Sequence, residues 1–506
     1  MSDPVSLMTG ETTLRKNCVG NPALSARLEP WMCEFLTSEH VAQNVTKHDS
    51  PLNVICPSPM SRNIAEIQSQ MEARGVASKI FFARKANKCL SFVDEAIRCD
   101  AGLDTASENE LRQCLQRGVC PDDIICTAAV KSDDLIDCCI ANQVCIAVDN
   151  RDELDAVVAR CRAVGKRAPI ALRLGGFLHD DSLRQLPTDG GHPSHADGPR
   201  QATKLPTRFG FDAVTDTGIV KQLCDLPIEV RGVHFHLDGY DAGQRVSGIT
   251  QSLRWIDLLR SAGHHPSFMD IGGGFPISYL DDGKQWETFW HQQERALLGR
   301  RDPVTYRNHG LGLIEHQGHI LGRRDSYPYH QSPVRGDWMA NILDSVIEGN
   351  TIAERLREAR IELRCEPGRS LLDGCGMTIS RVEFRKQNSD GDWLIGLSMN
   401  RTQCRTSSAD FLVDPILIRT NRSDADDPKS GFLVGAYCTE SELISLRKLT
   451  FPQGVARGDL VVFPNTAGYL MHFLESRSHQ FPLAKNLVVS ETLSVMELDA
   501  IDRRVD

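Results

Sequence analysis

Lys85 is the residue of this 506-residue chain whose surroundings most clearly demand a chemical role. It follows the apolar run Ile80–Ala83, which has the composition of a buried strand. A buried ammonium is costly unless it pairs with a carboxylate, or loses its proton and becomes a nucleophile. Downstream, Gly272–Gly274 and Glu366–Arg369 supply a phosphate cradle, a carboxylate and a guanidinium. A nucleophilic lysine together with these groups fits pyridoxal 5'-phosphate as a cofactor.

Each of these downstream groups has a distinct expected task. Backbone N–H groups exposed by Gly272, Gly273 and Gly274 can approach a phosphate closely. A carboxylate at Glu366 that faces the pyridine nitrogen would keep that nitrogen protonated and make the ring an electron sink. Arg369 can hold a phosphate through two parallel hydrogen bonds, a geometry that lysine cannot match.

Two histidines, His234 and His236, lie two residues apart on an expected strand, so their side chains point to the same face. His236 is nearer the carboxyl end and could stack on a planar cofactor, whereas His234 lies deeper. A zinc pair would need a third ligand, and none stands at an organised spacing. We therefore expect no metal here.

The elements that must position these residues follow from the hydrophobic pattern. From about residue 78, short β-branched or aromatic runs alternate with longer amphipathic stretches, which is typical of βα units and a parallel sheet. Eight such strands predict a (β/α)8 barrel, whose catalytic groups sit at the carboxyl ends of the strands and whose phosphate binds after strands seven and eight. The expected strands are 80–85, 101–106, 124–128, 144–148, 170–175, 230–236, 268–272 and 361–366.

The rest of the chain predicts a second domain. After residue 370 the runs are short, lack intervening helices and are separated by Asp, Asn, Ser and Gly, so we expect an antiparallel β domain over 371–506. Residues 1–58 contain one strand, 52–56, which we assign to the same domain. The barrel then occupies 59–370, with a long insertion at 277–360 that carries helices near 285–298 and 338–348.

Composition excludes several classes of partner. The net charge of −10, with lysine and arginine scattered, predicts neither nucleic acid nor an anionic membrane as a partner. No two of the 17 cysteines form a Cys-x-x-Cys pair, and no apolar run approaches the length of a membrane span. The first residues lack a basic segment leading into an apolar stretch. We expect a reduced, cytoplasmic protein.

Seven ordered motifs resemble those of the fold-type III pyridoxal-phosphate decarboxylases, which include diaminopimelate, ornithine and arginine decarboxylases. The resemblance covers most of the chain and implies an alanine-racemase-like barrel with a β domain. The motifs are Phe82–Asn87, Asp104–Ser107, His234–His236, Asp270–Pro276, Glu366–Arg369, Gly435–Cys438 and Gly468–Tyr469.

The resemblance implies roles for further residues. Lys85 resembles the lysine that holds the cofactor as an aldimine, Asp104 its neighbouring carboxylate, and Arg173 a polar group beside the cofactor. His236 resembles the imidazole that stacks on the ring, and Tyr469 the tyrosine near the phosphate and substrate. Each of these residue types stands at the matching motif position.

The family also places a cysteine and an acidic residue from the partner subunit at each site. Here these would be Cys438, a candidate proton donor to the substrate α-carbon, and Glu440 on the substrate side. A head-to-tail homodimer with shared active sites is therefore implied. Arg405 falls on the arginine that holds a distal substrate carboxylate in diaminopimelate decarboxylases.

The chain also departs from the family pattern. Where relatives have His-x-Gly-Ser, this chain has His236-Leu237-Asp238-Gly239, so a phosphate-binding serine is missing and Tyr240 or another group must compensate. The residues after Arg405 do not match either. We predict decarboxylation of a diamino acid or of a derivative with a distal carboxylate. A racemase, epimerase or lyase on the same scaffold, and an inactive binding protein, remain the alternatives.

Overall fold

The computed structural model describes residues 14–179, 202–407, 411–420 and 427–503. Eight parallel strands form a closed barrel, in which each strand pairs with the next and β6 pairs with β7. The eight strands predicted from the sequence are thus confirmed. In barrel order they are β7 (Ala168–Gly175), β11 (Ile228–Phe235), β12 (Phe268–Asp270), β17 (Glu362–Cys365), β3 (Ser78–Ala83), β4 (Gly102–Thr105), β5 (Ile124–Cys126) and β6 (Cys145–Val148).

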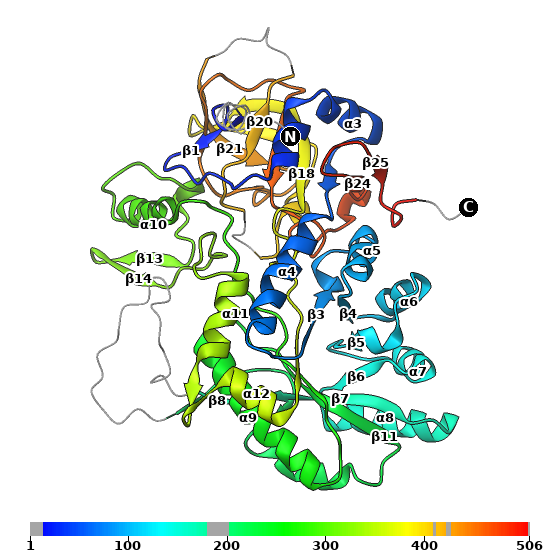
Figure 1. The fold of residues 1–506 in the computed structure, drawn as a ribbon. Coiled ribbons are helices and arrows are strands. Elements are labelled where there is room, and N and C mark those ends of the chain that lie inside the picture. Colours follow the sequence, from blue (N-terminus) through cyan, green and yellow to red (C-terminus); the bar gives the residue numbers. More distant parts are fainter. Residues whose placement is uncertain (1–13, 180–201, 408–410, 421–426, 504–506) are drawn as a thin grey trace.

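Helices surround this barrel (Figure 1). Their ends carry the expected signals: the Ser107 side chain caps α6, and α8 begins at the Asn150 cap and ends at Gly165 in a left-handed conformation. The helices of this layer are α4 (Pro59–Glu72), α5 (Ser91–Arg98), α6 (Glu108–Gln116), α7 (Asp133–Asn142), α8 (Arg151–Val164), α9 (Ala242–Ser261), α11 (Arg335–Asp344) and α12 (Ile352–Ala359).

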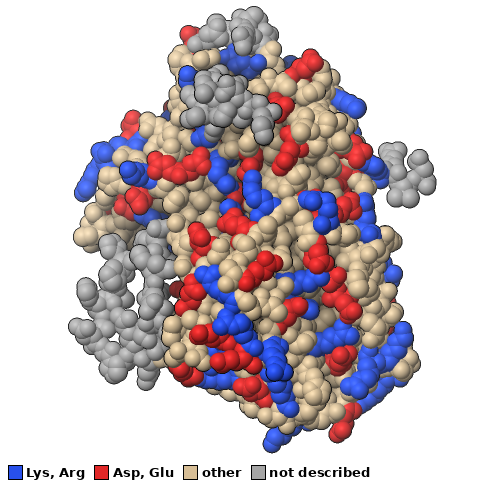
Figure 2. Space-filling view, in the orientation of Figure 1, with Lys and Arg blue, Asp and Glu red and all other residues tan. Residues whose placement is uncertain are grey.

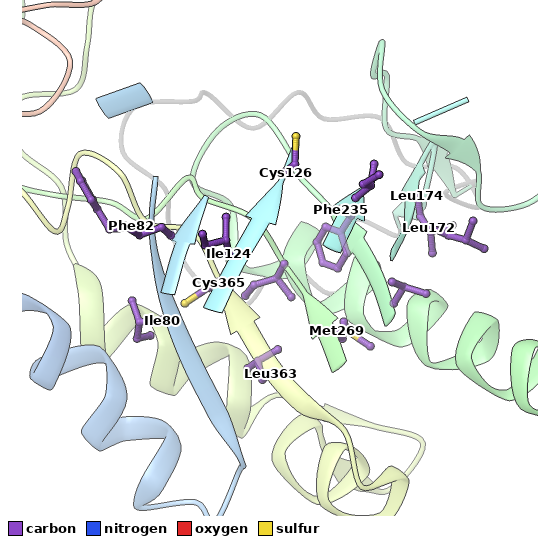
Figure 3. Close-up of a cluster of buried hydrophobic side chains, with 14 of the residues drawn as sticks. Ile80, Phe82, Ile124, Cys126, Leu172, Leu174, Phe235, Met269, Leu363 and Cys365 are labelled. Atoms are coloured by element: carbon purple, nitrogen blue, oxygen red, sulfur yellow. The ribbon is translucent and has the colours of Figure 1, made fainter. Parts of the chain in front are cut away.

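Barrel strands are apolar on both faces because one face meets helices and the other fills the barrel. Ile80, Phe82 and Leu363 belong to the large cluster shared with the helices, part of which is drawn in Figure 3. Phe81 and Phe268 belong to a small separate cluster of buried strand residues. Buried side chains on both faces of the strands therefore hold the strand ends in fixed positions.

A second sheet of ten strands lies beside the barrel (Figure 1). Most of its pairs are antiparallel, as predicted, but β19 with β21 and β2 with β24 are parallel. Strand β2 precedes the barrel, yet it pairs with β18, which follows the barrel. The strands are β1 (Val19–Gly20), β2 (Leu52–Ile55), β18 (Gly376–Gln387), β19 (Trp393–Leu397), β20 (Ile416–Ile418), β21 (Lys429–Val434), β22 (Leu449–Phe451), β23 (Leu460–Pro464), β24 (Lys485–Val489) and β25 (Met496–Leu498).

Between β12 and β17 lie the helix α10 (Gly283–Leu297), a hairpin of β13 (Leu313–His316) and β14 (His319–Gly322), and the helix α11. Trp286 and Trp290 of α10 pack in one hydrophobic cluster with residues of the ten-stranded sheet. Helix α11 packs instead against α4 and α9 of the barrel. The segment therefore bridges the two sheets.

Charged residues of both signs are interspersed over the face of the molecule shown in Figure 2. The described part of the chain contains no helix that is both long and apolar enough to span a bilayer.

Candidate active site

Lys85 lies in a short 3-10 turn, Arg84–Ala86, directly after β3. Its Nζ is 2.9 Å from Oδ2 of Asp104, which sits on the neighbouring strand β4. The other Asp104 oxygen accepts a hydrogen bond from the Thr127 hydroxyl. The Asp104 side chain is fully buried while that of Lys85 is 35% exposed, so the lysine lies between a buried carboxylate and the open mouth of the barrel.

The charge of Lys85 is set by two opposing effects. Burial lowers its pKa, but the carboxylates of Asp104 and Glu366 more than offset this, and the net pKa lies above the ordinary lysine value. Lys85 is therefore an ammonium held against a buried carboxylate, which resolves the cost expected of a buried cation.

Glu366 follows β17 and lies in a buried cluster with His234 and Asp270. Its Oε1 is 3.3 Å from His234 Nε2. Burial raises the pKa of Glu366, and burial together with Glu366 raises that of Asp270 further. Burial lowers the pKa of His234 well below its usual value, so this imidazole is neutral. Burial therefore disfavours the charged form of both carboxyl groups, and it does so more strongly for Asp270 than for Glu366.

The same three residues supply donor atoms within 4.8 Å of one another, a spacing that a metal ion could use. No third ligand for His234 could be predicted from local spacing, because Asp270 lies on β12 and Glu366 follows β17. A carboxyl pair that shares a proton is an equally complete explanation of this cluster, and it needs no ion.

The glycine loop after β12 packs against the loop after β17. Gly272 has φ 66° and its carbonyl accepts from the Glu366 N–H at 3.0 Å. A Cβ at Gly272 would lie 2.6 Å from the Phe235 carbonyl, so no side chain fits there. The Gly273 N–H donates to His236 Nδ1 at 3.1 Å. Burial lowers the pKa of His236 well below its usual value, so the accepting ring is neutral.

Arg173 and Tyr469 complete the barrel mouth. The Arg173 guanidinium is 3.6 Å from Asp149 and lies 4.0 Å from the centre of the Phe209 ring. Tyr469 donates its N–H to the Ala86 carbonyl at 2.8 Å, beside Lys85. Both residues therefore stand next to the groups predicted to hold the cofactor.

Arg369 is surrounded by tyrosines rather than by carboxylates. Its Nη1 is 3.4 Å from the Tyr279 hydroxyl, and its guanidinium lies 4.2 Å from the Tyr327 ring centre and 5.3 Å from that of Tyr469. Tyr279 and Tyr327 come from the segment between β12 and β17, so this insertion reaches the barrel mouth.

The remaining predicted site residues, Cys438, Glu440 and Arg405, lie on the part of the chain that follows the barrel. Cys438 and Glu440 are exposed. Arg405 is half-buried and donates to the Leu443 carbonyl at 2.8 Å. The buried acid of this region is Glu442, which accepts from the Arg401 N–H at 2.7 Å. A role for Cys438, Glu440 or Arg405 at the site stays a prediction.

Sequence reasoning missed several residues that the fold brings to the site. Asp270 could have been found, since only Ile271 separates it from the glycine triplet. Thr127 follows β5, but a threonine after a strand has no distinctive spacing. The others, on a helix or on the insertion, gave no local signal; they are Arg245, Tyr279 and Tyr327.

Comparisons with known proteins agree with this geometry. Residues 60–298 match the family model described as pyridoxal-dependent decarboxylase, pyridoxal binding domain. An uncharacterised protein, y4yA of Sinorhizobium fredii, is 30% identical over 458 residues, which cover 88% of this chain and 89% of the relative. The diaminopimelate decarboxylase of Pseudomonas aeruginosa is 22% identical, over 80% of this chain and 81% of the relative.

Solved structures share the fold. The diaminopimelate decarboxylase of M. jannaschii in complex with L-lysine has a TM-score of 0.66 at 16% identity, covering 92% of this chain and 94% of that one. The arginine decarboxylase of Paramecium bursaria Chlorella virus bound to agmatine has a TM-score of 0.61 at 17% identity, over 89% and 98% of the two chains. Fold and site thus define an alanine-racemase-like barrel protein. The chain belongs to the fold-type III pyridoxal-phosphate-dependent decarboxylase family.

The residues at the barrel mouth fit the family's cofactor. The glycine loop packs directly against the loop that carries Glu366, and Lys85 stands on the same rim. Among the described residues, Glu366 Oε1 and Arg173 Nε are buried without a hydrogen-bond partner. Buried polar atoms of this kind are normally satisfied, so a polar ligand in the mouth accounts for them.

Proposed function

We propose that this protein is a pyridoxal-phosphate-dependent decarboxylase of an amino acid, with a diamino acid or a derivative carrying a distal carboxylate as substrate. The observation that carries the proposal is the Lys85–Asp104 pair on the same barrel mouth as Glu366. A nucleophilic lysine and a carboxylate for the ring nitrogen are the two groups that this cofactor chemistry requires.

The chain's own residues divide the work. Lys85 is the attachment point for the cofactor aldehyde, and Asp104 holds the ammonium in place until the proton leaves. Glu366 faces the ring nitrogen, with Asp270 and His234 behind it fixing its charge and orientation. When bound, the cofactor stabilises the electron pair left on the α-carbon as carbon dioxide departs.

The His236 ring would stack on the bound cofactor, and the Gly273 N–H fixes the orientation of this ring by donating to its Nδ1. A neutral His236 suits this place, because a cationic one would repel the positive charge that Glu366 is proposed to stabilise on the cofactor ring. Arg173 would lie beside the bound cofactor. Its phosphate would be bound by Gly272–Gly274, Arg369 and Tyr469.

The second half of the site comes from a partner subunit in this proposal. Cys438 and Glu440 are exposed, as residues that act in another subunit's site must be in a single chain. Cys438 delivers the proton to the α-carbon after decarboxylation. Arg405, Glu440 and Tyr469 contact the substrate, and Arg405 binds its distal carboxylate.

An amino-acid panel tests the proposal. Purified protein with pyridoxal phosphate is incubated with single amino acids, including diamino acids with and without a distal carboxylate, and released carbon dioxide is measured. We expect release from a substrate with a second charged end, and none from the Lys85→Ala protein. α-Deuterium exchange without release would show a racemase, epimerase or lyase instead. No aldimine absorbance with the cofactor present would show a binding protein.

Arg405→Met tests the choice of substrate separately from the reaction type. We expect it to raise KM for a substrate with a distal carboxylate while kcat and cofactor absorbance change little, because a carboxylate clamp acts mainly in binding. Arg401→Met, on the same turn, is the control and should leave KM unchanged. Equal KM values for the two variants would remove Arg405 from the substrate site.

A further inference from the structure

Arg245 is a fully buried arginine in the first turn of α9, with 0% of its surface exposed. Its Nη2 donates to the carbonyls of Leu237 at 2.8 Å, Gly239 at 2.9 Å and Gly273 at 3.3 Å. Its other two nitrogens, Nε and Nη1, have no hydrogen-bond partner among the described residues. This guanidinium is therefore only partly satisfied inside the protein.

Arg245 connects the two loops at the phosphate end of the barrel mouth. Leu237 and Gly239 belong to the loop in which the family's serine is missing, and Gly273 belongs to the glycine triplet. Gly274 leaves room for the guanidinium, since a Cβ there would lie 2.3 Å from Nη2. The arginine thus holds the altered loop against the glycine loop.

The hydrogen bonds from Arg245 also set the direction of the loop's donors. In a trans peptide the carbonyl and the N–H point in opposite directions. Because the Gly273 carbonyl faces Arg245, the N–H of Gly274 in the same peptide unit faces away from it. A backbone N–H presented in this way is the kind of donor that binds phosphate.

The charge of Arg245 has no close counterion. No carboxylate among the described residues lies within ion-pair distance, and burial lowers the pKa of Arg245 to about 10 against the weaker opposing effects of Asp241 and Asp238. Arg369 is a second, half-buried guanidinium, which contacts the hydroxyls of Tyr279 and Thr406 and the ring of Tyr327. One buried and one half-buried cation, neither with a carboxylate partner among the described residues, are costly in the free protein and would be stabilised by one dianion.

We propose that Arg245 is the positioning residue for the cofactor phosphate, and that it replaces the serine missing at Gly239. It holds both loops by their carbonyls and supplies a positive charge in addition to that of Arg369. The inference rests on the proposed use of pyridoxal phosphate at Lys85. It adds a residue that no family motif contains, at the place where this chain departs from the pattern.

Paired ligands test this role. The cofactor-free protein is titrated with pyridoxal 5'-phosphate and with pyridoxal, which lacks the phosphate, and attachment to Lys85 is followed by visible absorbance. We expect Arg245→Met to weaken pyridoxal phosphate binding at least about tenfold, the loss of one charge-assisted interaction, and pyridoxal binding less than about threefold. Arg245→Lys should fall between, since lysine keeps the charge but loses the fork.

The control variant is Arg254→Met, on the exposed side of the same helix, which should leave both affinities unchanged. Circular dichroism of each variant checks the fold, and Arg245→Lys decides the question if Arg245→Met does not fold. Equal losses for the two ligands would show a structural clamp, and no loss for either would show no role; both overturn the proposal. A wild-type protein that binds neither ligand at Lys85 would instead overturn the proposed function.

Discussion

Asp104 raises the pKa of Lys85, the residue that we propose as the attachment point of the cofactor. The pair is 2.9 Å apart, and the carboxylate helps to keep the pKa of Lys85 above its ordinary value. Asp104→Asn should therefore lower that pKa, so that the neutral amine forms at lower pH. We expect the pH profile for the rate of cofactor attachment to shift toward acid, measured by stopped-flow absorbance.

Thr127→Val is the control for this experiment. It removes the hydroxyl that donates to Asp104 but leaves the carboxylate charge in place. Its profile should shift much less than that of Asp104→Asn. If the two profiles coincide with the wild type, Asp104 does not set the charge of Lys85.

Residues that end strands could be predicted from the sequence, because a barrel brings all carboxyl strand ends to one rim. Lys85 and Glu366 were found in this way. Arg245 was not, since an arginine within an amphipathic helix has no local feature that separates it from a solvent-exposed one. The orientation of a helix about its own axis decides that difference, and tertiary packing sets the orientation.

Helix α11 connects the insertion to the phosphate end of the site through Trp338. The indole is 3% exposed, its ring centre is 4.8 Å from that of Phe275, and its Nε1 donates to the Tyr240 carbonyl at 2.8 Å. Trp338→Ala should lower the free energy of unfolding by about 3–5 kcal/mol, as buried aromatic truncations do. Urea unfolding measures this loss.

Trp338→Phe separates packing from the hydrogen bond. It keeps a ring against Phe275 but removes the indole donor to Tyr240, so we expect about 1–2 kcal/mol of destabilisation. An alanine variant no less stable than the phenylalanine variant would mean that the indole contributes no packing energy.

The helices of the insertion were predicted near residues 285–298 and 338–348, and α10 and α11 lie close to those ranges. Their amphipathic periodicity made this possible. The packing partners of these helices could not be predicted, because periodicity shows that one face of a helix is apolar but not which element covers that face. Trp286 packs toward the ten-stranded sheet, whereas Trp338 packs in the barrel's helical layer.

Shared active sites would make activity a property of the dimer. In the proposed head-to-tail dimer, mixing Lys85→Ala with Cys438→Ala subunits creates heterodimers with one native site and one doubly altered site. After unfolding and refolding of an equimolar mixture, we expect about a quarter of wild-type activity, since half the dimers are mixed and each has one native site. A mixture no more active than its components would place both residues in one subunit's site.

His472 couples the stability of the ten-stranded sheet to pH. Its Nε2 lies 2.8 Å from Asn486 Oδ1, and burial lowers its pKa to about 3. The unfolded chain binds a proton at this residue near pH 6.5, so stability is lost as pH falls from there toward 3, by up to about 1.4 kcal/mol per pH unit.

His472→Gln should reduce this acid sensitivity, which urea unfolding at pH 7 and pH 5 at one protein concentration measures. His234 and His236 also have lowered pKa values and will leave a residual slope in the variant. An unchanged difference between the two pH values would mean that His472 is protonated in the folded protein.

The barrel's position between β2 and β18 also sets the order in which the two sheets can form during synthesis. Asn53 on β2 and Thr378 on β18 share a hydrogen bond of 2.9 Å although they lie 325 residues apart. At roughly 5–20 residues per second, a ribosome needs on the order of tens of seconds to add that stretch. All eight barrel strands have been synthesised by then, whereas β2 has had no neighbouring strand to pair with. The site-bearing half can therefore fold on the ribosome before the sheet that holds the chain's two ends together.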